Sequence, residues 1–556
     1  MKHRNILKGL LIIYVISIGY VSAQGVVNVQ NGNINHYFKD FSVPGHGYNL
    51  ELERSFNSKS SFYGMFGHKW GSNFDTLFTI TPEGTVEITE YGGGFKTTFS
   101  PEKYNQSEVT AFINAIYDKV PPASKSETLK NSLKTDTEFR HKLAREYKVT
   151  KSIGFGTKLF AMDRGPETLE KVKSKTGVTQ WVRSFSDGKK EFFSEQGRLF
   201  RKEDPNKNFL NLEYDAQGRL AKVRDLSGRQ ITFTYTAKGL VESVMNPLGK
   251  KSLYKYDKEG NLIYAKNARG YDFNYQYNPA HHLTEVIYVS SEQKEIMKYD
   301  AEDRLTYHEG PEDIITTYQY DTKGNPDKYF NVLLTKETGK KPTQVTTVDK
   351  YEYEFGEREN GTSYTFKIVT VLDGARTETV YNACCGKPLS IVQDGKTTKF
   401  DYYANGLLKN KISPSGEKIE LSYENTFKKV SKVIQSYPKL KQAPDITEFK
   451  YDANGNLSYA FNKTKKISVQ LFYDTKGRVK QLQDQNKRKI SFDYNELGKP
   501  TKISLEGTGS IIVSYNAAGE ITNVKSTTGR QIAVDITATF QSLLDIIRPA
   551  GVSLNI

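Results

Sequence analysis

Long hydrophobic runs are absent from this 556-residue sequence beyond its N-terminus. Its one apolar stretch, Leu10 to Tyr20, is too short to span a membrane comfortably, so we expect no transmembrane segment. No cysteine follows that stretch, which argues against a lipoprotein anchor. Basic residues precede it and the small residues Val21-Ser22-Ala23 follow it, the pattern of a secretory signal peptide over residues 1–23. We therefore expect an exported chain.

Recognisable catalytic and metal-binding motifs are also lacking. The eight histidines show no His-Glu-x-x-His or comparable ligand spacing. There is no Gly-x-Ser-x-Gly elbow and no phosphate-binding loop. We expect no enzymatic activity, no catalytic residue, no cofactor and no bound metal.

The positive charge is not gathered in one place. The net charge is +15, but Lys and Arg alternate with acidic residues, as in Lys189-Lys190-Glu191. Binding to nucleic acid normally needs a basic stripe, so we expect no nucleic-acid partner. A mild attraction to anionic cell surfaces that weakens with salt fits the charge better.

The most regular feature of the sequence is a motif that recurs about every 21 residues between Phe193 and Ile521. It consists of an aromatic residue, Asp or Asn, two variable positions, Gly, a basic or polar residue and an aliphatic residue. A clear copy is Tyr214-Asp215-Ala216-Gln217-Gly218-Arg219-Leu220. The other anchor tyrosines are Tyr235, Tyr256, Tyr277, Tyr299, Tyr320, Tyr402, Tyr423, Tyr451, Tyr473, Tyr494 and Tyr515. Similarity at a fixed period indicates a repeat architecture.

Each period is predicted to contain two antiparallel strands. Glycines recur at half the period, and runs of six to eight residues between them alternate strictly, as in Ile231, Phe233 and Tyr235. Period-two alternation of β-branched and aromatic residues is typical of half-buried strands. The fold class is therefore mainly β, a long antiparallel meander of roughly thirty strands.

The repeated Asp and Gly are predicted to form the turns between strands. An Asp side chain accepts hydrogen bonds from nearby backbone N–H groups, and Gly tolerates positive φ. A calcium role is disfavoured, because each copy offers only one carboxylate. The predicted turn residues are Asp215, Gly218, Asp257, Gly260, Asp452, Gly455, Asp474 and Gly477.

The Tyr-Asp-x-x-Gly-Arg-Leu motif resembles the YD repeat of RHS-type proteins, which are bacterial polymorphic-toxin carriers, and of their animal relatives, the teneurins. Asp40-Phe41-Ser42-Val43-Pro44-Gly45, Glu53-Arg54-Ser55-Phe56-Asn57-Ser58 and Phe66-Gly67-His68-Lys69-Trp70 resemble the domain that precedes RHS repeats in many bacterial members. The resemblance implies that the repeats form a spiralling β-shell around a cavity.

Two segments depart from the strand pattern. Ile113, Ile116 and Val120 recur at helical spacing, and the pair Pro166 and Gly177 brackets a further predicted short helix. Phe540, Leu543 and Leu544 form a helical stripe near the C-terminus. We divide the chain into a signal peptide (1–23), an RHS-type N-terminal β-domain (24–100), a helical insertion (101–180), a YD-repeat array (181–530) and a C-terminal amphipathic helix and tail (531–556).

A single-layer sheet cannot leave its apolar face in water. We predict that the helical insertion or the C-terminal helix packs against the inner face of the sheet as a plug. The alternative is that these helices cover the outside, and the sequence leaves both arrangements open.

The two cysteines, Cys384 and Cys385, are adjacent in the chain. Exported proteins usually oxidise their thiols, but the Cα atoms of neighbouring residues lie about 3.8 Å apart, below the usual disulfide range. We favour a tight turn, with or without a disulfide, over a redox switch or a metal site.

Two functions remain for such a chain. Toxin-carrying members of the resembled family end their repeats with an Asp-Pro-x-Gly motif and a toxin domain. This sequence has no such motif, and only 26 residues follow Arg530. We favour a non-enzymatic shell, periplasmic, at the cell surface or secreted, that binds a surface, protein or glycan partner, as in adhesion. The alternative is a polymorphic-toxin carrier component that encloses its helical segment.

Overall fold

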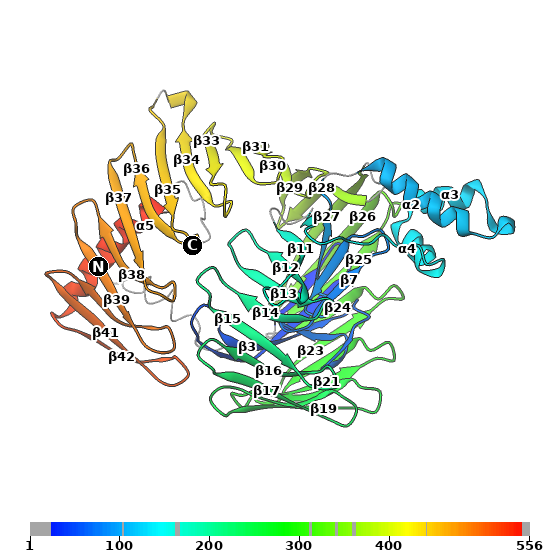
Figure 1. Cartoon of the computed structure of the whole chain (residues 1–556), viewed down its shortest axis with the longest axis horizontal. Coiled ribbons are helices and arrows are strands. Elements are labelled where there is room, and N and C mark those ends of the chain that lie inside the picture. The colour runs from blue at the N-terminus through cyan, green and yellow to red at the C-terminus, as the bar shows by residue number, and fades with distance from the viewer. Residues whose placement is uncertain are drawn as a thin grey trace.

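The computed structural model describes residues 24–547, except 103–104, 162–166, 311–313, 340–342, 359–362 and 441. The predicted signal peptide, residues 1–23, lies outside the described residues. The described chain is mainly β, as predicted, and most of it forms one very long curved sheet (Figure 1).

This sheet contains 36 antiparallel strands in sequence order, with β9 paired to β10 and α2 to α4 inserted between them. Its two edges are β7 and β42, which show no pairing with each other in the described part of the chain, so the sheet stays open. The expected count of about thirty strands was close.

The strands of the first half are β7 (Thr76–Ile80), β8 (Val86–Glu90), β9 (Phe95–Ser100), β10 (Lys158–Ala161), β11 (Thr168–Lys173), β12 (Thr179–Ser184), β13 (Lys190–Ser194), β14 (Leu199–Glu203), β15 (Phe209–Tyr214), β16 (Leu220–Asp225), β17 (Gln230–Tyr235), β18 (Val241–Met245), β19 (Lys251–Tyr256), β20 (Leu262–Lys266), β21 (Asp272–Tyr277), β22 (Leu283–Tyr288), β23 (Gln293–Tyr299), β24 (Leu305–Gly310) and β25 (Ile314–Asp321).

The second half continues with β26 (Tyr329–Thr338), β27 (Val345–Glu357), β28 (Ser363–Leu372), β29 (Ala375–Tyr381), β30 (Pro388–Gln393), β31 (Lys396–Tyr402), β32 (Leu408–Ile412), β33 (Lys418–Tyr423), β34 (Val430–Ser436), β35 (Asp445–Tyr451), β36 (Leu457–Asn462), β37 (Ile467–Tyr473), β38 (Val479–Asp484), β39 (Lys489–Tyr494), β40 (Pro500–Leu505), β41 (Gly509–Tyr515) and β42 (Ile521–Ser526). A 3₁₀ turn, η3 (Pro438–Leu440), lies between β34 and β35.

Each anchor tyrosine joins its repeat to the one before it. At every anchor tyrosine except Tyr320 the strand register shifts at a β-bulge next to the tyrosine, as between Thr234 and Tyr235. The side chain then reaches back along the sheet, and Tyr235 Oη donates to the backbone carbonyl of Leu220 at 2.7 Å. The same bond recurs in twelve repeats, from Tyr214 to Tyr515.

A second, four-stranded sheet covers the inner face of the first half. Its order is β1 (Gln24–Asn28), β2 (Asn33–Val43), β3 (Leu50–Asn57) and β6 (Trp70–Ser72), beside the short hairpin β4 (Tyr63–Gly64) and β5 (Gly67–His68). Phe38 on β2 packs against Phe273 and Tyr275, and Trp70 Nε1 donates to Tyr277 Oη at 2.8 Å. The predicted N-terminal β-domain (24–100) therefore divides, because β7 to β9 belong to the large sheet.

An ion pair is buried in this interface. Arg54 on β3 donates from Nε and Nη2 to the two carboxylate oxygens of Asp40, at 2.7 and 3.0 Å. Tyr254 on β19 donates to the same carboxylate at 2.7 Å. Both charged side chains are almost fully buried, 0% and 1% exposed. The pair and the tyrosine thus fix how the small sheet docks on the large one.

The helical insertion is shorter than predicted. Its helices are α2 (Gln106–Lys119), η1 (Pro122–Ser124), α3 (Glu127–Thr135) and α4 (Thr137–Glu146). The prediction that helical structure continues to residue 180 is wrong. Residues 168–173, placed in a short helix, form β11, because they pair on both sides and bury Leu169 in the sheet core. Gly177 has φ 82° in the turn between β11 and β12, so the glycine marks a hairpin.

The two helical regions lie in different places. Helices α2 to α4 bury Ile113, Ile116 and Leu133 in a small core of their own and project outside the sheet (Figure 1). Helix α5 (Arg530–Ile547) instead packs on β36, β37 and β40 to β42. The prediction that one of the two helical regions packs on the inner face is therefore confirmed, and the region that does so is the C-terminal helix.

Helix α5 covers the same sheet face as the N-terminal domain does. Its Ile532 and Ile536 share a core with Leu421 and Leu471. Each of those leucines precedes its anchor tyrosine by two positions, as Tyr275 does before Tyr277 in the first half. Since alternate residues of a strand share a face, both covers lie on the inner face.

The sheet also folds back on itself as a spiral would. Asn206, in the turn after β14, exchanges side-chain hydrogen bonds with Asn456, in the turn after β35, at 2.9 and 3.2 Å. Asn208 Nδ2 donates to the carbonyl of Lys476 at 3.0 Å, and Lys476 Nζ lies 2.9 Å from His46 Nε2. Turns about 250 residues apart therefore touch. Among the described residues, no helix is long and apolar enough to cross a membrane.

Breaking the buried ion pair should destabilise the docked N-terminal sheet. Arg54→Ala leaves the Asp40 carboxylate buried without its cation, which typically costs about 3–5 kcal/mol. Lys39→Ala is the matched control, because Lys39 neighbours Asp40 on β2 but is 55% exposed and pairs with Glu51 and Glu53 at the surface; its loss should cost at most about 1 kcal/mol. Urea unfolding followed by tryptophan fluorescence measures both, and equal effects would refute this account.

The cover by α5 is tested with a charge on either side of the helix. Ile536→Asp places a carboxylate in the core shared with β37 and should speed amide hydrogen exchange in β36, β37 and β41. Val534→Asp, on an exposed position of the same helix, should leave exchange there unchanged. Unchanged exchange with both variants would show that α5 does not protect these strands.

Candidate functional site

The predicted turn residues lie in hairpin turns, and their side chains form hydrogen bonds within those turns. Asp215 Oδ1 accepts from the backbone N–H groups of Gln217 and Arg219, at 3.0 and 2.8 Å, and its Oδ2 accepts from Arg219 Nε at 2.8 Å. Slight burial acts to raise the pKa of Asp215, but these bonds outweigh it and lower the pKa. Gly218 completes the turn with φ 81°.

The other predicted turns repeat this arrangement. Asp474 accepts from the backbone of Lys476 and Arg478, and Asp452 accepts from that of Asn454 and Asn456. Asp257 holds Asn261 in the same way. Gly260, Gly455 and Gly477 have φ of 91°, 79° and 78°. These carboxylates therefore act within their own turns.

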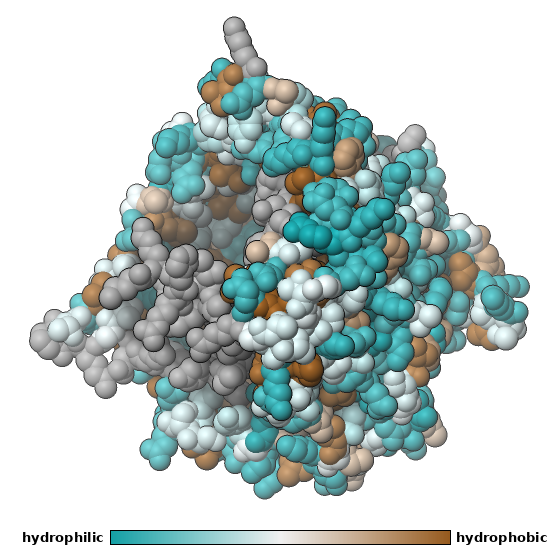
Figure 2. Space-filling view, turned by 90° about the vertical axis from the view of Figure 1, so that its left-hand side faces the viewer, coloured by the Kyte–Doolittle hydropathy of each residue, from teal (hydrophilic) through white to brown (hydrophobic). Residues whose placement is uncertain are grey.

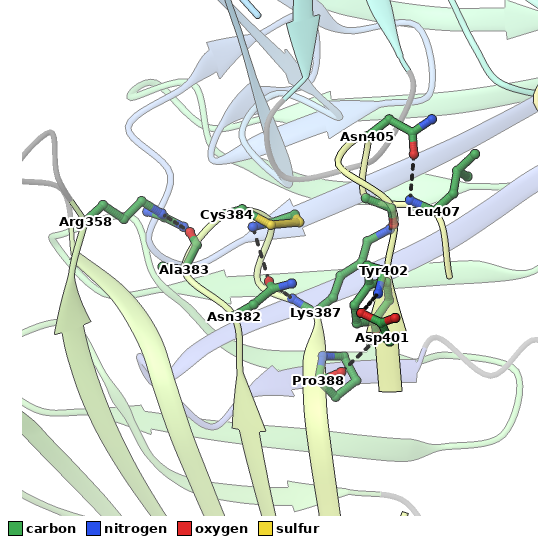
Figure 3. The surroundings of a disulfide bond; sticks show 12 residues. Arg358, Asn382, Ala383, Cys384, Lys387, Pro388, Asp401, Tyr402, Asn405 and Leu407 are labelled. Atoms are coloured by element: carbon green, nitrogen blue, oxygen red, sulfur yellow. Dashed lines mark hydrogen bonds between the residues drawn. A yellow bond between two sulfur atoms is a disulfide. The ribbon is translucent and has the colours of Figure 1, made fainter. Parts of the chain in front are cut away.

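Cys384 and Cys385 form a disulfide between neighbouring residues in the turn after β29 (Figure 3). Asn382 takes the place of the usual Asp, and its Oδ1 accepts from the backbone N–H groups of Cys385 and Lys387, at 3.3 and 3.0 Å. Lys387 Nζ donates to the carbonyl of Gly406 in the next repeat turn at 2.6 Å. The pair thus occupies an ordinary repeat turn that has its own hydrogen-bonded frame.

A cluster that the sequence did not reveal joins the two sheets. His36 on β2 points at Glu295 on β23 and His308 on β24. His36 Nδ1 lies 3.6 Å and His308 Nε2 lies 3.2 Å from Glu295 Oε2, and the three ligand atoms all lie within 4.8 Å of one another. Tyr288 Oη donates to the other carboxylate oxygen, Oε1. His36 and Glu295 are buried, and His308 is 18% exposed.

Burial sets the protonation of this cluster. It lowers the pKa of His36 to about 4, so this imidazole is neutral at pH 7. Burial also acts to raise the pKa of Glu295, but His36 and the hydrogen bonds from His308 and Tyr288 outweigh it and lower the pKa. The cluster therefore holds a buried carboxylate, and no Lys or Arg pairs with it in the described part of the chain.

A signal for the cluster was present in the repeat itself. Glu295 lies four residues before Tyr299, a position that is uncharged before every other anchor tyrosine. His308 lies nine residues after Tyr299, where the four preceding copies carry Val223, Val244, Ala265 and Val286, all fully buried. Reading each residue against its repeat position would have singled out this one copy.

An open groove lies on the N-terminal sheet, on the side away from the large sheet's core. It has a volume of about 400 Å³, and Asn28, Asn33, Asn35 and Tyr37 line it together with Phe95. Amide groups beside aromatic rings can bind neutral polar molecules through hydrogen bonds and ring contacts.

The family model described as teneurin YD-shell matches residues 178–331 and 211–552. These matches cover more than half of the sequence. The chain belongs to the teneurin YD-shell family. A model described as a domain of unknown function (DUF6531) matches residues 24–93, the region of the N-terminal sheet and of β7 and β8. The resemblance to RHS and YD-repeat proteins is thereby confirmed.

No curated protein matches the chain. Among solved structures, the "Crystal Structure of TcdB2-TccC3-Cdc42" has 11% identity and a TM-score of 0.44 over 87% of this chain and 32% of that one. The "Crystal Structure of TcdB2-TccC3-TEV" has 9% identity and a TM-score of 0.44 over 94% and 35%. A Photorhabdus luminescens Tc holotoxin pore has 10% identity and a TM-score of 0.42 over 88% and 34%. This chain spans about a third of the length of those chains.

The turn at Cys384-Cys385 should depend on Asn382 more than on the disulfide. A disulfide between adjacent residues closes the smallest possible loop. Closing a loop of that size stabilises the folded protein by about 1 kcal/mol. Cys384→Ser/Cys385→Ser should therefore lower the free energy of unfolding by about 1 kcal/mol or less. Asn382→Ala, which removes the acceptor of two backbone N–H groups, should lower it by more. The reverse order in urea unfolding would assign the turn to the disulfide.

Proposed function

We propose that this YD-shell protein is exported, has no enzymatic activity and binds a surface, protein or glycan partner at the cell envelope or outside the cell. The observation that carries the proposal is the coverage of the inner face by the chain's own elements. The N-terminal sheet occupies it in the first half and α5 in the last strands. Such a molecule is a scaffold that presents its outer surfaces.

Two outer features are suited to a partner. The helical unit α2 to α4, inserted between β9 and β10, has its own core. It is held against the turn between β7 and β8 by Arg140 to Glu83 and by Lys151 N–H to the carbonyl of Pro82 at 2.8 Å. The asparagine-lined groove offers amides and the Tyr37 ring. On the face seen in Figure 2, polar residues predominate around a hollow and apolar residues are scattered, which suits contact with water.

The competing function is a polymorphic-toxin carrier that encloses its helical segment. The position of α2 to α4 outside the sheet does not fit that arrangement (Figure 1). The basic and apolar pattern of residues 1–23 supports export.

Binding to whole cells tests the proposal. The fluorescently labelled full chain, starting at Gln24, should bind bacterial cells, and its expression in a bacterial cytoplasm should leave growth unaffected.

Two variants locate the partner surface. Replacing residues 106–146 with a short Gly-Ser linker should keep the fold, because β9 and β10 pair with each other without the helices. Loss of binding in this variant assigns the partner surface to the helices, and loss in Asn35→Ala/Tyr37→Ala assigns it to the groove. Growth arrest by the full chain, or no cell binding, would refute the proposal.

A further inference from the structure

We propose that His36, Glu295 and His308 bind a divalent transition-metal ion of the zinc class that fastens the N-terminal sheet to the YD shell. Two imidazoles and one carboxylate form a ligand set that Zn²⁺ accepts in proteins. The three residues come from different strands of two separate sheets.

The geometry fits such an ion. Ligand atoms about 2.0–2.1 Å from a tetrahedral zinc lie about 3.3 Å from one another. The distances from Glu295 Oε2 to His308 Nε2 and His36 Nδ1, 3.2 and 3.6 Å, bracket that value. Tyr288 holds Oε1 and leaves Oε2 facing both rings, as residues behind a metal ligand commonly do.

The hydrogen-bond inventory points to a missing partner. Neither ring nitrogen of His36 makes a hydrogen bond among the described residues, although the side chain is fully buried. An unsatisfied buried polar group costs about 1–3 kcal/mol, so a second function normally accounts for it. A cation at this point would engage the free nitrogen and neutralise the buried carboxylate together.

The repeat pattern argues against a packing role. Glu295 and His308 stand at inward positions where the preceding copies carry Phe273 and Val286. His36 alternates on β2 with Ile34 and Phe38, which pack into the core. Apolar residues of similar size would pack there without the cost of desolvation. Three exceptions that converge on one point suggest a common ligand.

Metal content and thermal unfolding of the full chain test the site. The purified chain should carry about one zinc per molecule. Removal of the zinc with a chelator should lower the thermal unfolding midpoint, Tm, and addition of Zn²⁺ should restore it. Glu295→Gln should weaken binding by at least about 100-fold, and Tyr288→Phe, which only removes the carboxylate's orienting bond, by about 10- to 100-fold. His141→Ala, in α4 outside the sheet, is the control and should bind as the natural chain does.

A second variant separates binding from folding. Glu295→Leu/His308→Val restores the pattern of the other repeats and should fold with a Tm at least equal to that of the metal-free natural chain, but without any response to Zn²⁺. Absence of zinc from the natural chain together with a Tm that Zn²⁺ leaves unchanged would overturn the proposal, leaving a hydrogen-bonded His-Glu-His cluster. Retention of one zinc by the double variant would overturn it equally.

Discussion

The hydrogen bond from each anchor tyrosine to a carbonyl of the preceding repeat is the interaction on which the shell depends. In a meander of short strands, no covalent cross-link fixes how one hairpin aligns with the next. The tyrosine helps to fix this alignment, because its ring fills the inner face beside the bulge and its hydroxyl binds the start of the strand about 15 residues earlier. Since the bond always joins neighbouring strands of successive repeats, it aligns the sheet locally, one repeat at a time.

The buried apolar residues of the inner face form two separate cores. The first core ends near Tyr353 and the second begins at Ile419. Between them, β29 turns Thr377 and Thr379 inward at the positions that Ile231 and Phe233 hold in β17. Hydroxyl groups tolerate water, so these two positions do not need an apolar cover. β29 thus lies between two halves of the sheet that have separate cores.

Most of the fold could be predicted from the sequence because its strands and turns depend on residues close together in the chain. The strand alternation of Ile231, Phe233 and Tyr235 and the turn chemistry of Asp215 and Gly218 each depend on neighbours a few residues away. The placement of the helices was not predictable in this way, because an amphipathic stripe shows only that a helix needs a partner. Leu133 packs within its own helical unit, whereas Ile536 packs on the sheet.

Residues 168–173 were misassigned because proline and glycine mark the ends of hairpin strands as well as of helices. The His36 cluster was missed for a related reason: its members lie up to 272 residues apart, and motif spacing cannot detect that.

The docking of the N-terminal sheet has a consequence for how the chain folds during synthesis. Asp40 meets Tyr254 across 214 residues of sequence, whereas each strand of the large sheet needs only the strand made just before it. As the chain emerges, the shell can grow by adding hairpins to its edge, but the N-terminal sheet must wait with Phe38 and Trp70 uncovered until β19 to β21 exist. Its apolar face is then a nucleus around which the first turn of the shell curls. The N-terminal sheet is thus synthesised before the strands of the shell that pack around it.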